Sequence, residues 1–159
     1  MVVTAFILTG QYLNFRMRKR ISSLNDYIFL IEGINSQISF SQKNIREIIN
    51  ELTSSENIRL RAMNELKQKN DMDFSVSWKE AITVFGNNDC LNKEDEKILL
   101  SFGSALGLTD LQGQSNNCRL HIGMLTKQLH SAEEKLKEKS KITTALSVFS
   151  AVVAVIIFY

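Results

Sequence analysis

The sequence predicts an all-α protein, a small bundle of about six helices flanked by an apolar membrane helix at each end. Turn and strand signals are scarce, because the 159 residues include no proline and only seven glycines, and alternating β-branched runs with Asn-Gly turns are missing. Apolar residues recur at helical spacing through most of the chain. Two uncharged apolar segments, residues 1–15 and 142–159, are each bordered on the inner side by basic residues.

The C-terminal segment has the length of a membrane span. Residues 142–159 (ITTALSVFSAVVAVIIFY) contain no charge, glycine or proline, and as a helix they cover about 27 Å of a hydrocarbon layer about 30 Å thick. A buried helix of a soluble domain is the alternative, but such a helix rarely lacks a polar face. By the positive-inside rule, the basic residues before the segment predict that the preceding domain is cytoplasmic. These residues are Lys135, Lys137, Lys139 and Lys141.

The N-terminal segment, residues 1–15 (MVVTAFILTGQYLNF), is uncharged but spans only about 22 Å as a helix. A secretory signal carries its charge before the apolar run, whereas here the basic cluster follows it: Arg16, Arg18, Lys19 and Arg20. We therefore expect a retained span that exits on the cytoplasmic side, with a short interfacial helix that does not cross as the alternative. The domains are then residues 1–15 (transmembrane or membrane-associated), 16–141 (cytoplasmic helical bundle) and 142–159 (transmembrane helix).

Apolar periodicity predicts that the first helix continues to about residue 38. Its stripe comprises Ile21, Leu24, Tyr27, Ile28, Leu30, Ile31, Ile34 and Ile38. A break at residues 39–41 allows Ser41 to cap a second helix that runs to about residue 52. A weaker apolar pattern predicts a third helix over residues 56–69.

Two further helices are marked by their caps. Trp78, Ala81, Ile82 and Phe85 form one helical face, and Gly86 is the predicted C′ stop before a loop at residues 86–89. Asn92 is the predicted N-cap of the next helix. Its first turn carries three acidic residues, whose negative charge interacts favourably with the helix dipole. That helix is predicted to end in a Schellman motif at Gly107.

The last helix is predicted to start at a Thr109–Gln112 capping box and to continue into the C-terminal span. Apolar residues spaced three and four apart give it a heptad seam, which packs either against the first helix of the same chain or against a second copy. The seam consists of Cys118, Ile122, Leu125, Leu129, Ala132 and Leu136.

The composition and motifs offer no catalytic site. The net charge of +2 comes largely from the two basic clusters and does not indicate nucleic-acid binding. The thiols Cys90 and Cys118 are isolated, which suits a reducing compartment. Cys118 and His121 lie one turn apart but lack further metal ligands, and the GSALG run at residues 103–107 lacks a phosphate-binding lysine. We expect a non-enzymatic protein without metal or cofactor.

Two segments carry a resemblance to a known family. Trp78 lies in VSWKEAI, and residues 98–114 read ILLSFGSALGLTDLQGQ. With the terminal spans, these segments resemble the stage III sporulation protein AB family of endospore-forming Firmicutes. That family's soluble region is similar to the cytoplasmic F-type platform domains of type II secretion and type IV pilus machines. The most specific residues are Trp78, Phe102, Gly103, Leu106, Gly107, Asp110 and Gln114.

The resemblance implies a platform in the channel that links mother cell and forespore. It implies a location in the mother-cell membrane facing the forespore, with the bundle cytoplasmic. The implied partners are the secretion-type ATPase stage III sporulation protein AA and other channel ring proteins.

The motif residues also have structural interpretations. Trp78 is expected in the core, although a partly exposed tryptophan can dominate a protein contact. Asp110 is expected in the first turn of the last helix, and Gln114 is either solvated or hydrogen-bonded between helices. Gly103 allows helices to approach closely, and Gly107 supplies a left-handed residue.

Two other functions remain open. A membrane-bound coiled-coil scaffold would self-associate through the seam at residues 118–136. A lipid hydrolase or lipid regulator would need a polar pocket with converging titratable groups, which the sequence does not indicate.

Overall fold

The computed structural model describes residues 2–40, 47–48 and 74–158, with side chains for residues 11–40, 47–48 and 75–139. Within these ranges it contains four helices and no strand: α1 (Val2–Phe40), α4 (Phe74–Asn88), α5 (Lys93–Ala105) and α6 (Leu111–Phe158). The all-α class is confirmed. The helices predicted at residues 41–52 and 56–69 lie almost wholly outside the described residues, so the count of about six stays a prediction.

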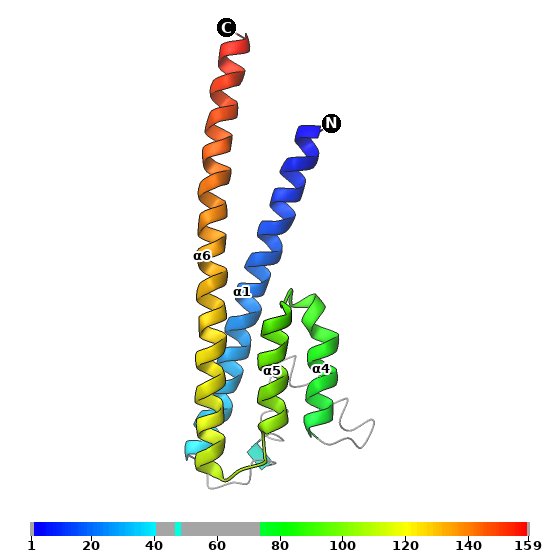
Figure 1. Ribbon diagram of the computed structural model, residues 1–159, viewed down its shortest axis with the longest axis vertical. Coiled ribbons are helices and arrows are strands. Elements are labelled where there is room, and N and C mark those ends of the chain that lie inside the picture. Colours follow the sequence, from blue (N-terminus) through cyan, green and yellow to red (C-terminus); the bar gives the residue numbers. More distant parts are fainter. Residues whose placement is uncertain (1, 41–46, 49–73, 159) are drawn as a thin grey trace.

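The two longest helices, α1 and α6, are antiparallel neighbours (Figure 1). Arg20 on α1 bonds to Gln128 on α6, and Asn35 further along α1 bonds to Ser115 on α6. The antiparallel pairing brings the N- and C-termini to the same end of the molecule. Helix α5 packs against α6, and α4 packs against α5, beside the half of the pair that is remote from the termini.

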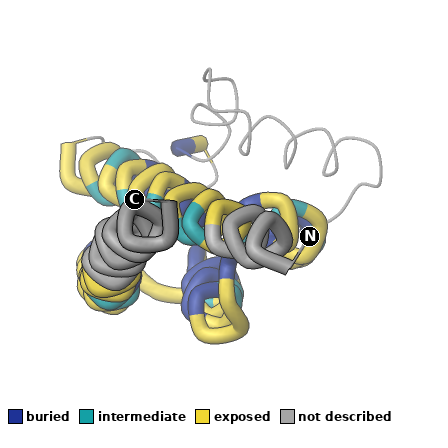
Figure 2. The backbone as a smooth tube through the Cα atoms, turned by 90° about the horizontal axis from the view of Figure 1, so that it is seen from above, coloured by how far each residue is buried: buried dark blue, intermediate teal, exposed yellow. Residues whose placement is uncertain are grey.

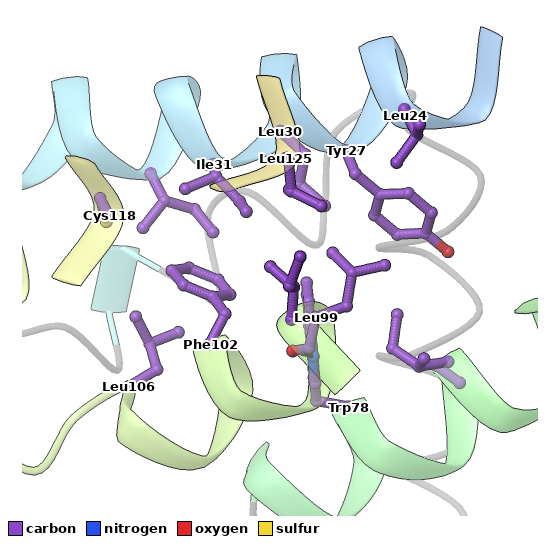
Figure 3. Close-up of a cluster of buried hydrophobic side chains, with 14 of the residues drawn as sticks. Leu24, Tyr27, Leu30, Ile31, Trp78, Leu99, Phe102, Leu106, Cys118 and Leu125 are labelled. Atoms are coloured by element: carbon purple, nitrogen blue, oxygen red, sulfur yellow. Dashed lines mark hydrogen bonds between the residues drawn. The ribbon is translucent and has the colours of Figure 1, made fainter. Parts of the chain in front are cut away.

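The core lies where the helices face one another, and buried residues gather on those sides (Figure 2). Of the stripe predicted on the first helix, Leu24, Tyr27, Leu30, Ile31, Ile34 and Ile38 are buried. Phe102 and Leu99 of α5 point at this stripe, with Cys118 and Leu125 of α6 beside them (Figure 3). Burying each large apolar side chain contributes about 1.5–3 kcal/mol, so this stripe is a principal source of stability.

The seam on α6 packs against α1 of the same chain. Cys118, Leu125, Leu129 and Ala132 are buried, whereas Ile122 and Leu136 are partly exposed. Of the two partners that the sequence left open for this seam, the structure therefore supplies α1.

Helix α4 ends later than predicted. Gly86 is still helical, and the left-handed residue is Cys90, with φ of 56°. The Cys90 N–H donates to the Asn87 carbonyl (3.3 Å) and the Leu91 N–H donates to the Gly86 carbonyl (3.1 Å). These two bonds form a Schellman motif with Cys90 at C′. The predicted stop at Gly86 was wrong, because this glycine supplies a carbonyl of the motif rather than its left-handed residue.

Helix α5 begins as predicted and ends differently. Asn92 is the N-cap: its side chain accepts from the Asp95 N–H (2.8 Å) while the Asp95 carboxylate accepts from the Asn92 N–H (2.9 Å). Gly107 is left-handed as expected (φ 85°). Leu106 is extended, however, and the Leu108 N–H donates to the Ala105 carbonyl, 3.4 Å away. This is a type II turn with glycine at its third position, so the predicted Schellman motif was wrong here.

With Thr109 as its N-cap, helix α6 would begin at residue 110, but it begins at Leu111. The Asp110 carboxylate accepts from the Gly113 N–H (2.9 Å), so Asp110 caps the helix. The Thr109 hydroxyl instead accepts from the Gln114 side chain (2.8 Å).

Within the part of the chain that the structure describes, no helix has both the length and the hydropathy for a membrane crossing. The side chains of residues 1–10 and 140–159 are outside that part. The spans at residues 1–15 and 142–159 therefore stay predictions.

Candidate functional site

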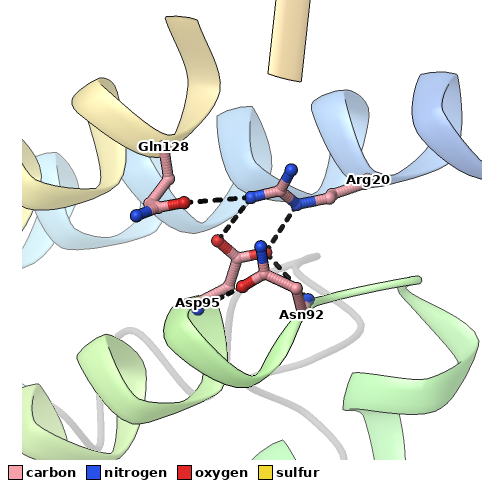
Figure 4. A network of polar contacts seen from close by, with 4 residues as sticks. All are labelled: Arg20, Asn92, Asp95 and Gln128. Carbon is pink, nitrogen blue, oxygen red and sulfur yellow. Dashed lines mark hydrogen bonds and ion pairs between the residues drawn. The ribbon is translucent and has the colours of Figure 1, made fainter. Parts of the chain in front are cut away.

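Four polar residues join three helices near the middle of the α1–α6 pair (Figure 4). The Arg20 guanidinium donates through Nε to Asp95 Oδ2 (2.7 Å) and through Nη2 to Asp95 Oδ1 (2.9 Å). Nη2 also donates to Gln128 Oε1 (3.1 Å), and Asp95 closes the capping box with Asn92. We call Arg20, Asn92, Asp95 and Gln128 the polar clamp.

The polar clamp is an ion-paired contact buried between helices. Asp95 is fully buried and Arg20 nearly so. Burying a lone charge is costly, and the two-point pairing with the guanidinium offsets that cost only while both partners are present. The clamp thus favours one arrangement of α5 against α1 and α6.

The predicted basic clusters divide between the core and the surface. Arg20 belongs to the clamp, although the sequence placed it with the membrane-flanking cations. Arg16, Arg18 and Lys19 on α1 are exposed, as are Lys135, Lys137 and Lys139 on α6; the side chain of Lys141 is outside the described residues. Interactions with the side chain of Cys90, first a hydrogen bond, and with that of Tyr12 raise the pKa of the exposed Arg16.

The first part of the family motif builds the contact between α4 and α5. The Trp78 indole is buried and donates from Nε1 to the Leu99 carbonyl (2.7 Å). Its ring meets Phe102 edge-on, with centroids 5.5 Å apart. A Cβ added to Gly103 would lie 2.1 Å from Trp78 Cδ1, so the indole occupies the space that this glycine leaves. Trp78 is therefore in the core.

The second part of the motif builds the turn between α5 and α6. Gln114 is buried, accepts from the Gly107 N–H (3.1 Å) and donates to the Ala105 carbonyl (3.3 Å). With Asp110 capping α6 and Leu106 buried at the turn, Gln114 fixes the path of the chain there. Of the two possibilities for Gln114, the structure supports hydrogen bonding.

Cys118 and His121 are both buried in the bundle. Burial raises the pKa of the Cys118 thiol to about 11, so this thiol stays protonated at neutral pH. His121 Nδ1 is bonded to the Asn117 carbonyl (2.9 Å), and its ring meets Phe102 edge-on. Among the residues the structure describes, no three His, Cys, Asp or Glu side chains are grouped to hold a metal ion.

One open hollow lies beside α1, facing the loop between α4 and α5, with a volume of about 480 Å³. The described residues that line it are Phe15, Arg18, Lys19, Ser22, Ser23, Asp26 and Asp89. We call it the α1 hollow. It brings two cations, two hydroxyls and two carboxylates together.

Sequence reasoning missed the polar clamp, although a signal was present. Arg20 lies four residues before Leu24, on the line that the core stripe of α1 follows. Asp95 lies three and four residues before the core residues Ile98 and Leu99. Two opposite charges on two apolar faces could have been paired; the third partner, Gln128, has no comparable signal.

The comparisons with known proteins agree with this architecture. The family model described as stage III sporulation protein AB matches residues 1–159. A solved structure titled "Stage III sporulation protein AB (SpoIIIAB)" is similar with a TM-score of 0.62 at 15% identity, over 75% of this chain and 97% of that one. At this identity the likeness concerns the fold alone. No curated protein matches the chain. Because the family match covers every residue, the chain belongs to the stage III sporulation protein AB family.

Proposed function

We propose that this protein is a non-enzymatic membrane platform in the sporulation channel between mother cell and forespore, and that it docks a secretion-type ATPase. Family membership supports the link to sporulation. The observation that carries the platform role is the antiparallel pairing of α1 and α6, which brings both terminal segments to one end (Figure 1).

This pairing suits a protein held in one membrane by both ends. The described parts of the two apolar segments, residues 2–15 and 142–158, extend toward the same side, and the exposed basic residues of both helices follow them toward the bundle. By the positive-inside rule, the hairpin of α4 and α5 then projects into the mother-cell cytoplasm. An ATPase of that compartment, such as stage III sporulation protein AA, could reach it.

The described side chains favour a structural role over a catalytic one. The polar clamp, the Trp78 contact and the Gln114 turn use their polar groups to fasten helices together. The end of the molecule opposite the termini exposes three large apolar side chains: Phe40, Leu108 and Leu111. These positions are suited to crosslinking probes.

The test is site-specific photocrosslinking in sporulating cells. We expect a photoreactive residue at Leu108 to capture the ATPase or another channel protein, and the same residue at Leu120 on α6 to report background capture. A full-length protein that carbonate washes from membranes, or that never crosslinks to a channel component, would contradict the platform role.

The coiled-coil scaffold is less well supported, because its seam packs on α1. Self-association through residues 118–136 would require α1 to leave. The scaffold predicts that Leu125→Asp abolishes oligomers while the monomer stays folded. The platform predicts that the same change unfolds the monomer, because Leu125 is fully buried.

A further inference from the structure

We propose that Tyr12, Leu13 and Phe15 of α1 contact the phospholipid headgroup layer of the membrane, level with Lys135 and Lys137 of α6. The inference rests on the proposed function, since it takes the C-terminal apolar segment as the part of α6 that lies in the hydrocarbon. It goes further by assigning a lipid-contact surface to described side chains. It also shifts the predicted N-terminal span, because these three residues then lie outside the hydrocarbon.

The contact between Arg20 and Gln128 shows which residues of α1 and α6 lie at the same level. Arg20 Nη2 donates to Gln128 Oε1 (3.1 Å), and the two helices run antiparallel from that contact toward the termini. Tyr12 is eight residues beyond Arg20, and Leu136 is eight residues beyond Gln128. Both helices rise about 1.5 Å per residue, so Tyr12 and Leu136 are level with each other.

The bundle leaves the side chains of α1 exposed at this level. Tyr12, Leu13 and Phe15 are 60%, 44% and 63% exposed. Successive residues of a helix point about 100° apart, so these three side chains face different directions. Leu13 lies seven residues before Arg20, on the same face of α1, yet Arg20 is buried. The core therefore ends between them, where α1 and α6 separate toward the termini (Figure 1).

Helix α6 carries charges of both signs at the same level. Glu133, Glu134, Lys135 and Lys137 are all exposed, and charged side chains are costly to place in hydrocarbon. Three neighbouring large apolar side chains on α1 are, conversely, poorly placed in open water. The headgroup layer meets both requirements, because it is hydrated and charged and yet borders the acyl chains.

Tyr12 has the kind of side chain that is enriched in this layer. Tyrosine gathers at membrane–water interfaces, where its ring contacts apolar groups and its hydroxyl stays with polar ones. The Tyr12 side chain interacts with the guanidinium of Arg16, one turn nearer the bundle, and helps to raise the pKa of Arg16. The polar end of Tyr12 is therefore held on the side of the bundle, away from the N-terminal segment.

The test measures the depth of tryptophans introduced into the full chain in phosphatidylcholine vesicles. The vesicles contain a lipid whose nitroxide quenches tryptophan emission and lies on the headgroup, near the carboxyl end of an acyl chain or near its methyl end. Tyr12→Trp and Phe15→Trp report on the proposed surface. Phe29→Trp is the matched control, because Phe29 is 74% exposed on the same helix but lies further from the termini. Trp78 is buried, and its emission, measured in the unaltered chain, is subtracted.

We expect the emission of Tyr12→Trp and Phe15→Trp to fall most with the headgroup nitroxide. The emission of Phe29→Trp should stay unchanged with all three lipids. A greatest loss with the nitroxide near the carboxyl end of the chain would place these residues in the hydrocarbon, as a span at residues 1–15 does, and would overturn the proposal. Emission that none of the three lipids reduces would also overturn it, because the side chains would then lie in water.

Phe149→Trp, in the predicted C-terminal span, separates this proposal from the proposed function. Its emission should fall most with the nitroxide near the methyl end of the acyl chain. If it does, a contrary result at Tyr12 and Phe15 refutes the headgroup contact alone. If no lipid quenches Phe149→Trp, α6 does not enter the membrane, and both the membrane platform and the headgroup contact are wrong.

Discussion

Replacing Gly103 by alanine tests the packing of the motif most directly. The added Cβ would lie 2.1, 2.5 and 2.6 Å from Cδ1, Cγ and Nε1 of the Trp78 indole. The ring has little freedom to move, because Nε1 is bonded to the Leu99 carbonyl and its edge meets Phe102. The substitution must therefore displace the ring or separate α4 from α5.

The magnitude follows from three contributions. Overpacking a core costs about 1–3 kcal/mol, and losing the indole hydrogen bond adds about 1 kcal/mol. Alanine is a better helix former than glycine by about 1 kcal/mol, which opposes the loss. We expect Gly103→Ala to lower the free energy of unfolding by about 2 kcal/mol, or the melting temperature by about 4–8 °C in a chain of this length.

The assay is thermal unfolding of the full chain in detergent, followed by far-UV circular dichroism. Gly123→Ala in α6 is the matched control, because nothing lies within 4 Å of its added Cβ. It should stabilise the protein by about 0.5–1 kcal/mol. In a Trp78→Leu background, Gly103→Ala should become neutral or stabilising, with a coupling energy of at least about 1 kcal/mol. If Gly103→Ala is as stable as Gly123→Ala, the close contact with the indole is not real.

The remaining predictions concern the turns, the clamp and the buried thiol. Gly107→Val should destabilise the protein by more than about 1 kcal/mol, because a β-branched residue tolerates positive φ poorly; an unchanged melting temperature would refute the type II turn. Cys90→Gly should raise the free energy of unfolding in urea by about 0.5–1 kcal/mol, because Cys90 also has positive φ. A lower free energy of unfolding would mean that the contacts of the Cys90 side chain outweigh the backbone strain that glycine removes. Asp95→Asn should lower the free energy of unfolding by about 3–5 kcal/mol in the same assay, because it leaves Arg20 buried without its charged partner. A decrease below about 1 kcal/mol would mean that water already reaches the polar clamp. Iodoacetamide should leave Cys118 unlabelled at pH 8 and label it faster as the pH rises toward about 11, since only the thiolate reacts; rapid labelling at pH 8, read by peptide mass spectrometry, would contradict its burial.

Features with strong local signals could be predicted from the sequence. The core stripe of α1 and the seam of α6 repeat at helical spacing over many residues, and burial follows such a stripe closely. The Asn92 cap was also predictable, because a capping box depends on residues three apart.

Features set by distant contacts were not predicted. The left-handed residue after α4 is Cys90, although a glycine lies four positions earlier. The fold, rather than the residue type, decides where this helix ends and therefore which of its last carbonyls need hydrogen-bond donors. Arg20 and Asp95 are 75 residues apart, and each had a sufficient local explanation, one as a membrane-flanking cation and the other as a helix-dipole partner. Their pairing becomes visible only when both apolar faces are brought together.

The unbroken length of α6 has a mechanical consequence. At about 1.5 Å per residue, its 48 residues form a rod about 70 Å long without an internal break. A load applied where α5 meets α6 would tilt or rotate the whole rod instead of bending it at a hinge. A force applied to the hairpin of α4 and α5 would therefore move the opposite end of α6.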